Sequence, residues 1–283
     1  MTPRIIAAPL FGGPADATTV AAALAVARRF DGQVIGLFVH GSTADAVPIV
    51  GEGLSPEVVE QIVEAAKTDV DRRREVARRA FDTACAEGGV RIARQLRPAE
   101  HVVAVWHEVE GLAESVLPRN ARLSDLVVMA RSEEEQARSA TEATLLGCGR
   151  GVLIVPPEAV VRVETVAVAW NQGLEAARAV AAGLPFLGEA KDVHVLVADD
   201  EDVFAASTEL QDYLEAHGIV SQRRLVRRGD EATGVALLRA AGEAQADLLV
   251  MGAYGHSRLR ELVFGGVTHH VLAEATLPVL LAH

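Results

Sequence analysis

Cysteine, lysine and aromatic residues are all scarce in this chain of 283 residues. Its two cysteines, Cys85 and Cys148, lie far apart and form no CxxC pair, so neither a disulfide framework nor a cysteine zinc site is indicated. No apolar run reaches the roughly 20 residues of a membrane-spanning helix. The segment Met1–Leu10 lacks the basic start and the cleavage site of a signal peptide. We therefore expect a cytoplasmic protein that does not act at a membrane.

Positive charge is scarce as well. The chain has 27 lysines and arginines against 39 aspartates and glutamates, which gives a net charge of −12. The acidic excess is present on both sides of Glu158. A general nucleic-acid binder needs a basic face that displaces counterions. The charge pattern therefore excludes nucleic acid as a general partner.

The order of predicted elements repeats along the chain. Each half opens with an apolar segment of strand length, a loop that contains glycine, a helical segment and a second apolar strand. These segments are Arg4–Pro9, Ala17–Phe30 and Gln33–Val39 in the first half, and Thr165–Trp170, Leu174–Leu187 and Asp192–Val197 in the second. Later segments that also correspond are Ser124–Ala130 with Ala246–Gly252, and Gly151–Pro156 with Leu277–Ala282. The chain therefore carries an internal repeat.

The apolar strands show no alternation of apolar and polar residues, which is typical of strands buried on both faces of a parallel sheet. Right-handed crossovers then place helices on both faces. We predict an α/β protein with two domains, residues 1–158 and 159–283. The first domain contains an additional long helix that has Ser55 as its N-cap, runs to Phe81 and stops at Gly88–Gly89.

The segment Met251–Thr268 is the most informative for function. It leaves a buried strand and leads into a helix that begins near Val267. Its first glycines, Gly252 and Gly255, allow backbone N–H groups to approach a ligand closely, and Gly265 and Gly266 are expected to take positive φ and to expose further donors at the helix N-terminus. Such a segment suits a phosphate chain. The alternative is a strand-to-helix connection in which the glycines only shape the loop.

The glycine spacing Gly252-x2-Gly255-x9-Gly265 resembles that of the universal stress protein family. The preceding segment Asp247–Met251 and the closing strand with Pro278 are also similar to that family. The whole chain resembles a tandem member, two copies fused. The resemblance implies that each copy is a Rossmann-like, adenine-nucleotide α-hydrolase-like domain with a five-stranded parallel sheet, and that binding members hold ATP at the strand ends.

The resemblance carries over residue by residue. Gly266 stands where the family usually has serine or threonine, and Asn171 stands where binding members often carry aspartate. The backbone of Val197 matches a position that meets the adenine ring, and Thr268 offers a hydroxyl. The complete set of candidate binding residues is Asn171, Val197, Met251, Gly252, Gly255, His256, Gly265, Gly266, Val267 and Thr268. The expected ligand is ATP, with ADP or AMP as alternatives and Mg²⁺ as an accompanying ion.

The first half lacks the glycine motif. Its corresponding segment, Ala130–Glu135, contains three successive carboxylates and no glycine, and Leu10 occupies the acidic position after the first strand. Carboxylates repel a triphosphate. We therefore expect a first domain that does not bind nucleotide, and we interpret the glycine cluster Gly147–Gly151 as a turn because it precedes a strand.

Other candidates for chemistry are weaker. The histidines His256, His269 and His270 lack the i, i+4 spacing of a helical zinc pair. No GxSxG elbow or cysteine–histidine arrangement indicates a nucleophile, so we assign no catalytic residue and no metal ligand. The acidic run Asp199–Asp202 is interpreted as a solvated helix start, with Mg²⁺ binding as the alternative. The four arginines between Arg223 and Arg228 are interpreted as part of a polar edge strand.

These observations lead to one principal hypothesis and two alternatives. The chain is expected to be a stress-response protein whose second domain binds an adenine nucleotide as a signal, with slow or no hydrolysis, through ordering of the Ala253–Phe264 loop. The alternatives are a nucleotide-free scaffold that acts by protein association with a partner still unknown, and an adenine-nucleotide hydrolase. We also expect Val152–Val155 to pair with Val279–Leu281 as an intramolecular pseudo-dimer, with a homodimer of the chain as a further option.

Overall fold

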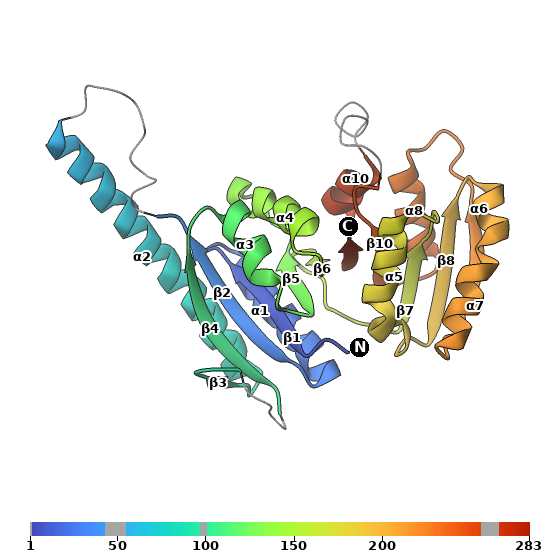
Figure 1. The fold of residues 1–283 in the computed structure, drawn as a ribbon, viewed down its shortest axis with the longest axis horizontal. Coiled ribbons are helices and arrows are strands. Elements are labelled where there is room, and N and C mark those ends of the chain that lie inside the picture. The colour runs from blue at the N-terminus through green and yellow to red at the C-terminus, as the bar shows by residue number, and fades with distance from the viewer. Residues whose placement is uncertain (1, 43–54, 97–100, 256–265) are drawn as a thin grey trace. The chain divides into compact units, whose positions relative to one another are not determined.

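The computed structural model describes residues 2–42, 55–96, 101–255 and 266–283 (Figure 1). The chain forms two compact units. One unit is Arg4–Cys148, and the other is Gly149–His283 together with the first residues of the chain. The boundary between the units therefore precedes the expected domain boundary at residue 158, and the strand that begins at Gly151 belongs to the second unit.

The first unit is a parallel sheet with helices packed on it. Its strands lie in the order β3-β4-β2-β1-β5, and every neighbouring pair is parallel. The central strands β1 and β5 are apolar and almost completely buried, as expected for strands covered on both faces. The elements are β1 (Ile5–Leu10), α1 (Ala15–Phe30), β2 (Gln33–His40), α2 (Pro56–Glu87), β3 (Arg91–Ala93), β4 (Val103–Glu110), α3 (Ala113–Ala121), β5 (Leu126–Ala130) and α4 (Glu135–Gly147).

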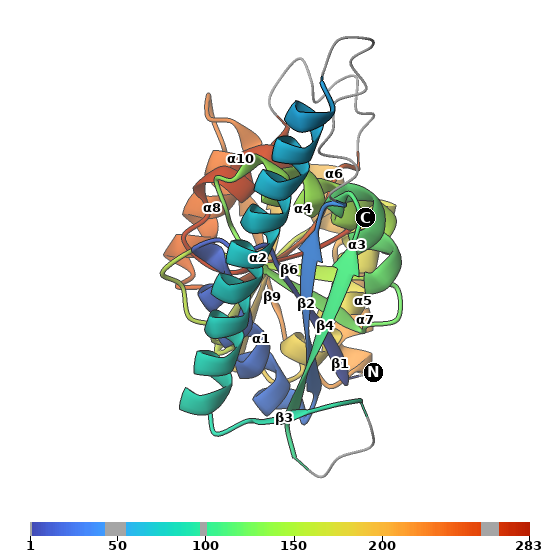
Figure 2. The same ribbon diagram turned by 90° about the vertical axis from the view of Figure 1, so that its left-hand side faces the viewer.

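Helix α2 is the longest helix of the first unit, with 32 residues. The predicted start is confirmed, because Ser55 is the N-cap and Pro56 the first helical residue, and Gly88 forms the predicted C-cap. Its buried side chains, Ala77, Phe81 and Cys85, all belong to its second half. The first turns of α2 lie beyond the ends of the strands of this unit (Figures 1 and 2).

The second unit contains a sheet in the order β6-β11-β10-β7-β8-β9. All neighbouring strands are parallel except β6 and β11, which pair antiparallel with Leu280 opposite Leu153. The predicted pairing of these two apolar segments is therefore confirmed. The elements are β6 (Gly151–Val155), β7 (Thr165–Ala169), α5 (Leu174–Leu187), β8 (Asp192–Ala198), α6 (Glu201–Ala206), α7 (Thr208–Ala216), β9 (Gln222–Val226), α8 (Thr233–Glu243), β10 (Leu248–Gly252), α10 (Val267–Glu274) and β11 (Val279–Ala282).

The chain direction across the second sheet reverses between β7 and β10. From β7 the chain proceeds to β8 and β9 on one side, and after α8 it continues through β10 and β11 on the other side. Right-handed crossovers place α5, α6 and α7 on one face and α8 and α10 on the other. In agreement, α5 packs against β7, β10 and β11, whereas α8 packs against β8 and β9 and contacts α10. Such a reversal leaves a crevice at the carboxyl ends of the strands.

The two units share a hydrogen-bonding pattern at their first strands. Asp125 accepts bonds from two successive backbone N–H groups at the start of β1, and Asp247 accepts bonds from two such groups at the start of β7. Counted from these bonds along the strands, the residue equivalent to Asn171 is Phe11. The assignment of Leu10 to that position was wrong by one residue, because the strands align through their hydrogen bonds and not through the ends of their apolar runs.

Most predicted elements of the fold are confirmed. The structure shows the α/β class, with five parallel strands in each unit and the antiparallel strand β6 in addition. Helix α5 has the predicted bounds, and the arginine-rich segment forms β9 at the edge of its sheet. Gly149 has φ of +64° between α4 and β6, so the glycine cluster is a turn as predicted. Within the described ranges, no helix combines the length and the apolar character needed to cross a membrane.

Candidate functional site

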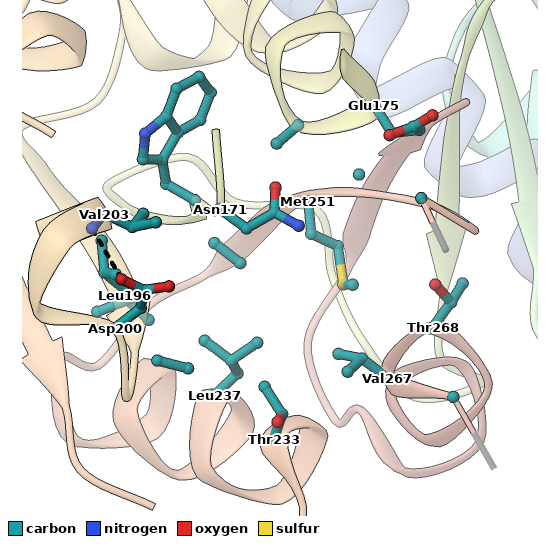
Figure 3. A pocket seen from close by; sticks show the side chains of 18 residues that line it. Asn171, Glu175, Leu196, Asp200, Val203, Thr233, Leu237, Met251, Val267 and Thr268 are labelled. Atoms are coloured by element: carbon teal, nitrogen blue, oxygen red, sulfur yellow. Dashed lines mark hydrogen bonds between the residues drawn. The ribbon is translucent and has the colours of Figure 1, made fainter. Parts of the chain in front are cut away.

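A cavity of about 550 Å³ opens at the carboxyl ends of β7, β8 and β10 in the second unit (Figure 3). This is the place where the strand order reverses, and ligands of open α/β sheets bind in such crevices. The residues that line the cavity are Ala169, Trp170, Asn171, Glu175, Ala176, Leu196, Val197, Ala198, Asp200, Val203, Thr233, Leu237, Met251, Gly252, Gly255, Gly266, Val267 and Thr268.

One side of the cavity is apolar. Leu196, Val203 and Leu237 project into it from β8, α6 and α8 (Figure 3). Val197 is only 1% exposed and continues this wall. The indole N–H of Trp170 is buried and has no hydrogen-bond acceptor among the described residues. A flat ring fits such a compartment, because contact with the apolar side chains removes the faces of the ring from water.

The opposite side is formed by glycines and the start of helix α10. Gly266 is the N-cap of this helix, so the first N–H groups of α10 have no intrahelical acceptor. The Thr268 hydroxyl is buried and accepts a hydrogen bond from the Tyr254 N–H at 3.2 Å. Helix N-termini of this kind favour anionic groups. The expected positive φ at Gly266 is wrong, because Gly266 has φ of −58°. Among the described residues near the cavity, Tyr254 is left-handed, with φ of +57°.

Asn171 lies in the middle of the cavity, next to Met251 (Figure 3). Its side-chain oxygen accepts a hydrogen bond from the Gly173 N–H at 2.9 Å, which closes a tight turn between β7 and α5. Gln172, inside this turn, has φ of +60°. The amide is therefore held by its own backbone, and its nitrogen can donate to a ligand.

Two carboxylates also line the cavity. Asp200 caps α6 by accepting a hydrogen bond from the Val203 N–H at 2.9 Å, which confirms the predicted helix start in the acidic run. Glu175 lies in the first turn of α5. Sequence reasoning did not assign either acid to the site, because a single sequence does not distinguish an acid that serves a helix start from one that faces a cavity. No lysine, arginine or histidine is among the described residues that line this cavity.

The glycines of the motif are also explained by packing. A methyl group at position 252 would lie 2.6 Å from the backbone nitrogen of Ala176, so the start of α5 requires glycine there. A methyl group at position 255 would lie 2.8 Å from Oε2 of Glu175. The protein itself therefore occupies the space beside both glycines, as in the alternative in which the glycines shape the loop.

Eight of the ten candidate binding residues line the cavity: Asn171, Val197, Met251, Gly252, Gly255, Gly266, Val267 and Thr268. The other two, His256 and Gly265, and most of the Ala253–Phe264 loop lie outside the described residues. Trp170 also lines the cavity. Whether these residues bind a nucleotide remains a prediction.

The remaining candidates that the structure describes lie away from the cavity. Neither His269 nor His270 lines the cavity, and His270 packs against Gly234 of α8. Within the part of the chain that the structure describes, no cluster of three metal-ligating side chains is present. Burial raises the pKa of the Cys85 thiol to about 11, so this cysteine is protonated at neutral pH.

In the first unit, Arg73 and Glu134 contact the loop that follows β1. A methyl group at Gly12 would collide with Arg73 of α2, and the Glu134 carboxylate lies against Gly13. Arg73 donates to Gln136 at 2.8 Å and forms an ion pair with Glu134 at 3.2 Å. The protein thus places an ion pair of its own beside the loop that follows β1.

A buried aspartate lies near Glu134 of this ion pair. Asp16 is 2% exposed and accepts hydrogen bonds from the backbone N–H groups of Phe11 and Gly12. Burial raises its pKa to about 6, although the N–H donors act in the opposite direction, and the nearby Glu134 adds to the increase.

Comparison with known proteins gives a consistent result. Residues 75–283 match the model of the Universal stress protein family. A segment of 45 residues is 49% identical to Universal stress protein Slr1230 of Synechocystis sp., and this match covers 16% of each chain. Only about a sixth of that relative's length is therefore matched.

Solved structures resemble the whole chain. A universal stress protein from Archaeoglobus fulgidus DSM 4304 has a TM-score of 0.67 at 14% identity, with 100% of this chain and 99% of that chain covered. A putative universal stress protein from Pseudomonas aeruginosa UCBPP-PA14 has a TM-score of 0.57 at 14% identity, with 99% and 93% covered. At this level of identity the likeness shows the fold alone.

Proposed function

Because the chain belongs to the universal stress protein family, we propose that its second unit binds an adenine nucleotide in the cavity at the ends of β7, β8 and β10. Nucleotide binding then serves as a signal, because a protein partner recognises the nucleotide-bound state. The repeated strand order and the shared aspartate hydrogen bonds support a tandem arrangement of two family domains, of which the second carries the site.

One observation carries the proposal: the cavity joins an apolar compartment to a helix N-terminus. The compartment formed by Leu196, Val203 and Leu237 suits the purine, and the N–H groups that follow Gly266 suit a phosphate. The Asn171 amide lies between them, where a ribose hydroxyl would be. The volume of about 550 Å³ is within the range of small-molecule pockets.

The first unit is proposed not to bind nucleotide. Arg73 and Glu134 lie against Gly12 and Gly13, in the loop that corresponds to residues 170–173 of the second unit, where Trp170 and Asn171 line the cavity. A ligand there would have to displace this ion pair and expose Asp16. The division of roles follows from this difference in side chains, because the strand framework is common to both units.

Hydrolysis is proposed to be slow. The described residues around the cavity contribute no lysine or arginine toward a phosphate chain, and Glu175 and Asp200 are the only ionisable side chains among them. Efficient phosphoryl transfer depends on cations that neutralise developing charge. A signal by population shift, in which ligand-bound and ligand-free states differ at the surface, needs no turnover. A Mg²⁺ ion would accompany a triphosphate if that were the ligand.

The test begins with the purified full chain. Bound nucleotide is released by denaturation and identified by mass spectrometry. Affinity is then measured by the fluorescence of Trp170, which lines the cavity, in a Trp106→Phe background that leaves Trp170 as the single tryptophan. We expect adenine nucleotides to change this fluorescence with saturation.

A pair of leucine substitutions supplies the control. Ala198→Leu fills the apolar compartment and is expected to weaken binding at least about 10-fold, whereas Ala205→Leu, on the exposed side of α6, is expected to leave it unchanged. Absence of binding at millimolar nucleotide would contradict the proposal and favour the nucleotide-free scaffold. The packing role of Gly252 is the observation that favours that alternative.

A further inference from the structure

The Glu175 carboxylate lies at the glycine side of the cavity. Its backbone is fixed there, because the main chain of Glu175 and Ala176 packs directly on Gly252. Its Oε2 atom lies 2.8 Å from the position that a methyl group would occupy at Gly255. Figure 3 shows Glu175 and Thr268 on the side of the cavity away from Asp200 and Val203. The carboxylate is therefore near the place where the proposed phosphate would meet α10.

The charge of the described lining residues is entirely negative. It consists of Glu175 at the glycine side and Asp200 at the apolar side, with no cationic side chain among the described lining residues. Asp200 lies beside Val203 and Glu175 lies on the side of Thr268 (Figure 3), so Glu175 is the acid closer to the proposed phosphate position. A carboxylate near a phosphate chain repels each added negative charge.

We propose that Glu175 determines which class of ligand this site binds. Because of its charge, the site binds adenine nucleosides and their monophosphates more tightly than the triphosphate. The inference rests on the proposed function, since it concerns the same cavity. The base and ribose contacts are common to all these ligands and give little discrimination. The single phosphate of a monophosphate reaches the N–H groups of α10, and the longer chain of a triphosphate brings further charges toward Glu175.

The experiment compares three ligands and three variants of the full chain. Dissociation constants of adenosine, AMP and ATP are measured by calorimetry in a buffer with EDTA, so that no divalent cation masks the carboxylate. The variants are Glu175→Gln, which removes the charge, Asp200→Asn, which removes the other acid of the cavity, and Glu114→Gln. Glu114 is the matched control because it is an exposed first-turn glutamate of α3 in the first unit.

We expect the wild-type chain to bind AMP at least about 10-fold more tightly than ATP, a difference of about 1.4 kcal/mol. Glu175→Gln is expected to reduce this ratio about 10-fold through tighter binding of ATP, with the affinity for adenosine unchanged. Glu114→Gln is expected to keep the wild-type ratio, and Asp200→Asn to change it less than Glu175→Gln.

A second measurement uses salt. Raising the ionic strength is expected to lower the ratio of the dissociation constants of ATP and AMP in the wild-type chain, because salt screens the partly exposed carboxylate. In Glu175→Gln this ratio is expected to stay nearly constant. The inference is overturned if the wild-type chain binds ATP most tightly of the three ligands, or if the ratio of the dissociation constants of ATP and AMP is the same in wild type and in Glu175→Gln. Either result still supports adenine-nucleotide binding in the cavity. Failure of all three ligands to bind overturns both proposals.

Discussion

Gly252 illustrates how one residue can be required for two reasons. It lines the cavity, and its missing side chain also allows the first turn of α5 to pack on the end of β10. The second requirement exists without any ligand. A glycine motif in a sequence therefore does not by itself separate a binding loop from a tight helix–strand contact.

The packing role predicts a loss of stability. In Gly252→Ala the new methyl group would lie 2.6 Å from the Ala176 nitrogen, and the backbone has to shift. We expect the free energy of unfolding in urea to fall by about 1–3 kcal/mol. The control is Gly242→Ala in α8, where a methyl group meets no atom within 4 Å; it is expected to raise stability by about 0.5–1 kcal/mol. Equal stabilities for the two variants would contradict the packing role.

Asp16 predicts a pH dependence of stability in the acidic range. Its pKa is raised from 3.8 to about 6 in the folded chain, chiefly by burial. As the pH falls, Asp16 therefore takes up a proton in the folded state before it does so in the unfolded state. The stability that this protonation adds is present at low pH and is lost as the pH rises through 6. When the pH is lowered from 7.5 to 4.5, the free energy of unfolding of the wild-type chain is expected to rise by about 2 kcal/mol relative to that of Asp16→Asn.

Urea denaturation of both chains at several pH values measures this difference. The other carboxylates titrate in both chains and cancel to first order in the comparison. A wild-type advantage that stays constant over this range, or that increases with pH, would show that the Asp16 carboxylate is not desolvated as the structure describes.

At the scale of elements, helix α2 consists of two halves with different support. Its buried residues, Ala77, Phe81 and Cys85, belong to the second half, where Arg73 also connects the helix to α4. The first half is held chiefly by its own backbone and by exposed ion pairs, and such pairs contribute only a few tenths of a kcal/mol each. The two halves are therefore expected to open at different free energies.

Hydrogen exchange measures this difference directly. We expect amides of Val59–Val70 to exchange at least about 100-fold faster than those of Ala80–Glu87. Helix α5 is the internal control, since its buried residues extend from Ala176 to Leu187 and its protection is expected to be uniform after the first turn. Uniform protection along α2 would mean that the first half has a partner that stabilises it.

The elements that could be predicted from the sequence are those with a long apolar run or a clear cap. Strand β10 and helix α5 are of this kind, and Ser55 with Pro56 marked the start of α2. Strand β4 was not predicted, because only Val103–Val105 is a buried apolar run, while the rest mixes polar and apolar residues and is more exposed. Its assignment depends on pairing with β2, and a neighbour distant in sequence is not visible in a local pattern.

The candidate site was predictable at its glycine side and less so elsewhere. The glycines and Thr268 follow one another along the chain, so a spacing pattern reveals them. Leu237 and Val203 reach the cavity from helices that follow other strands, and only the strand order brings them together. Glu175 was overlooked because an acid in the first turn of a helix is already explained by the helix dipole.

At the scale of the whole molecule, the position of β6 in the structure differs from its position in the sequence repeat. It closes the first half in the sequence, yet it belongs to the second unit, where all its residues are buried and it pairs with β11. A fragment that starts at residue 159 would lack this strand and leave the edge of β11 unpaired.

Two fragments test the contribution of β6. Residues 149–283 are expected to be more stable to urea than residues 159–283, by about 2–5 kcal/mol, because Val152, Leu153 and Ile154 are buried apolar residues. The matched control keeps the length of the longer fragment and replaces 150–155 by glycine and serine. It is expected to behave like the shorter fragment, and equal midpoints for all three would contradict a structural role of β6.

The pairing of β6 with β11 also bears on how genes of this kind can exchange segments. A crossover at the end of the first repeat would give a hybrid protein in which β6 and β11 come from different parents. The apolar side chains of the two strands would then not have evolved to pack together. A crossover between residues 148 and 149 would keep the two strands from one parent. We therefore expect viable recombinants between related genes to join at the earlier position.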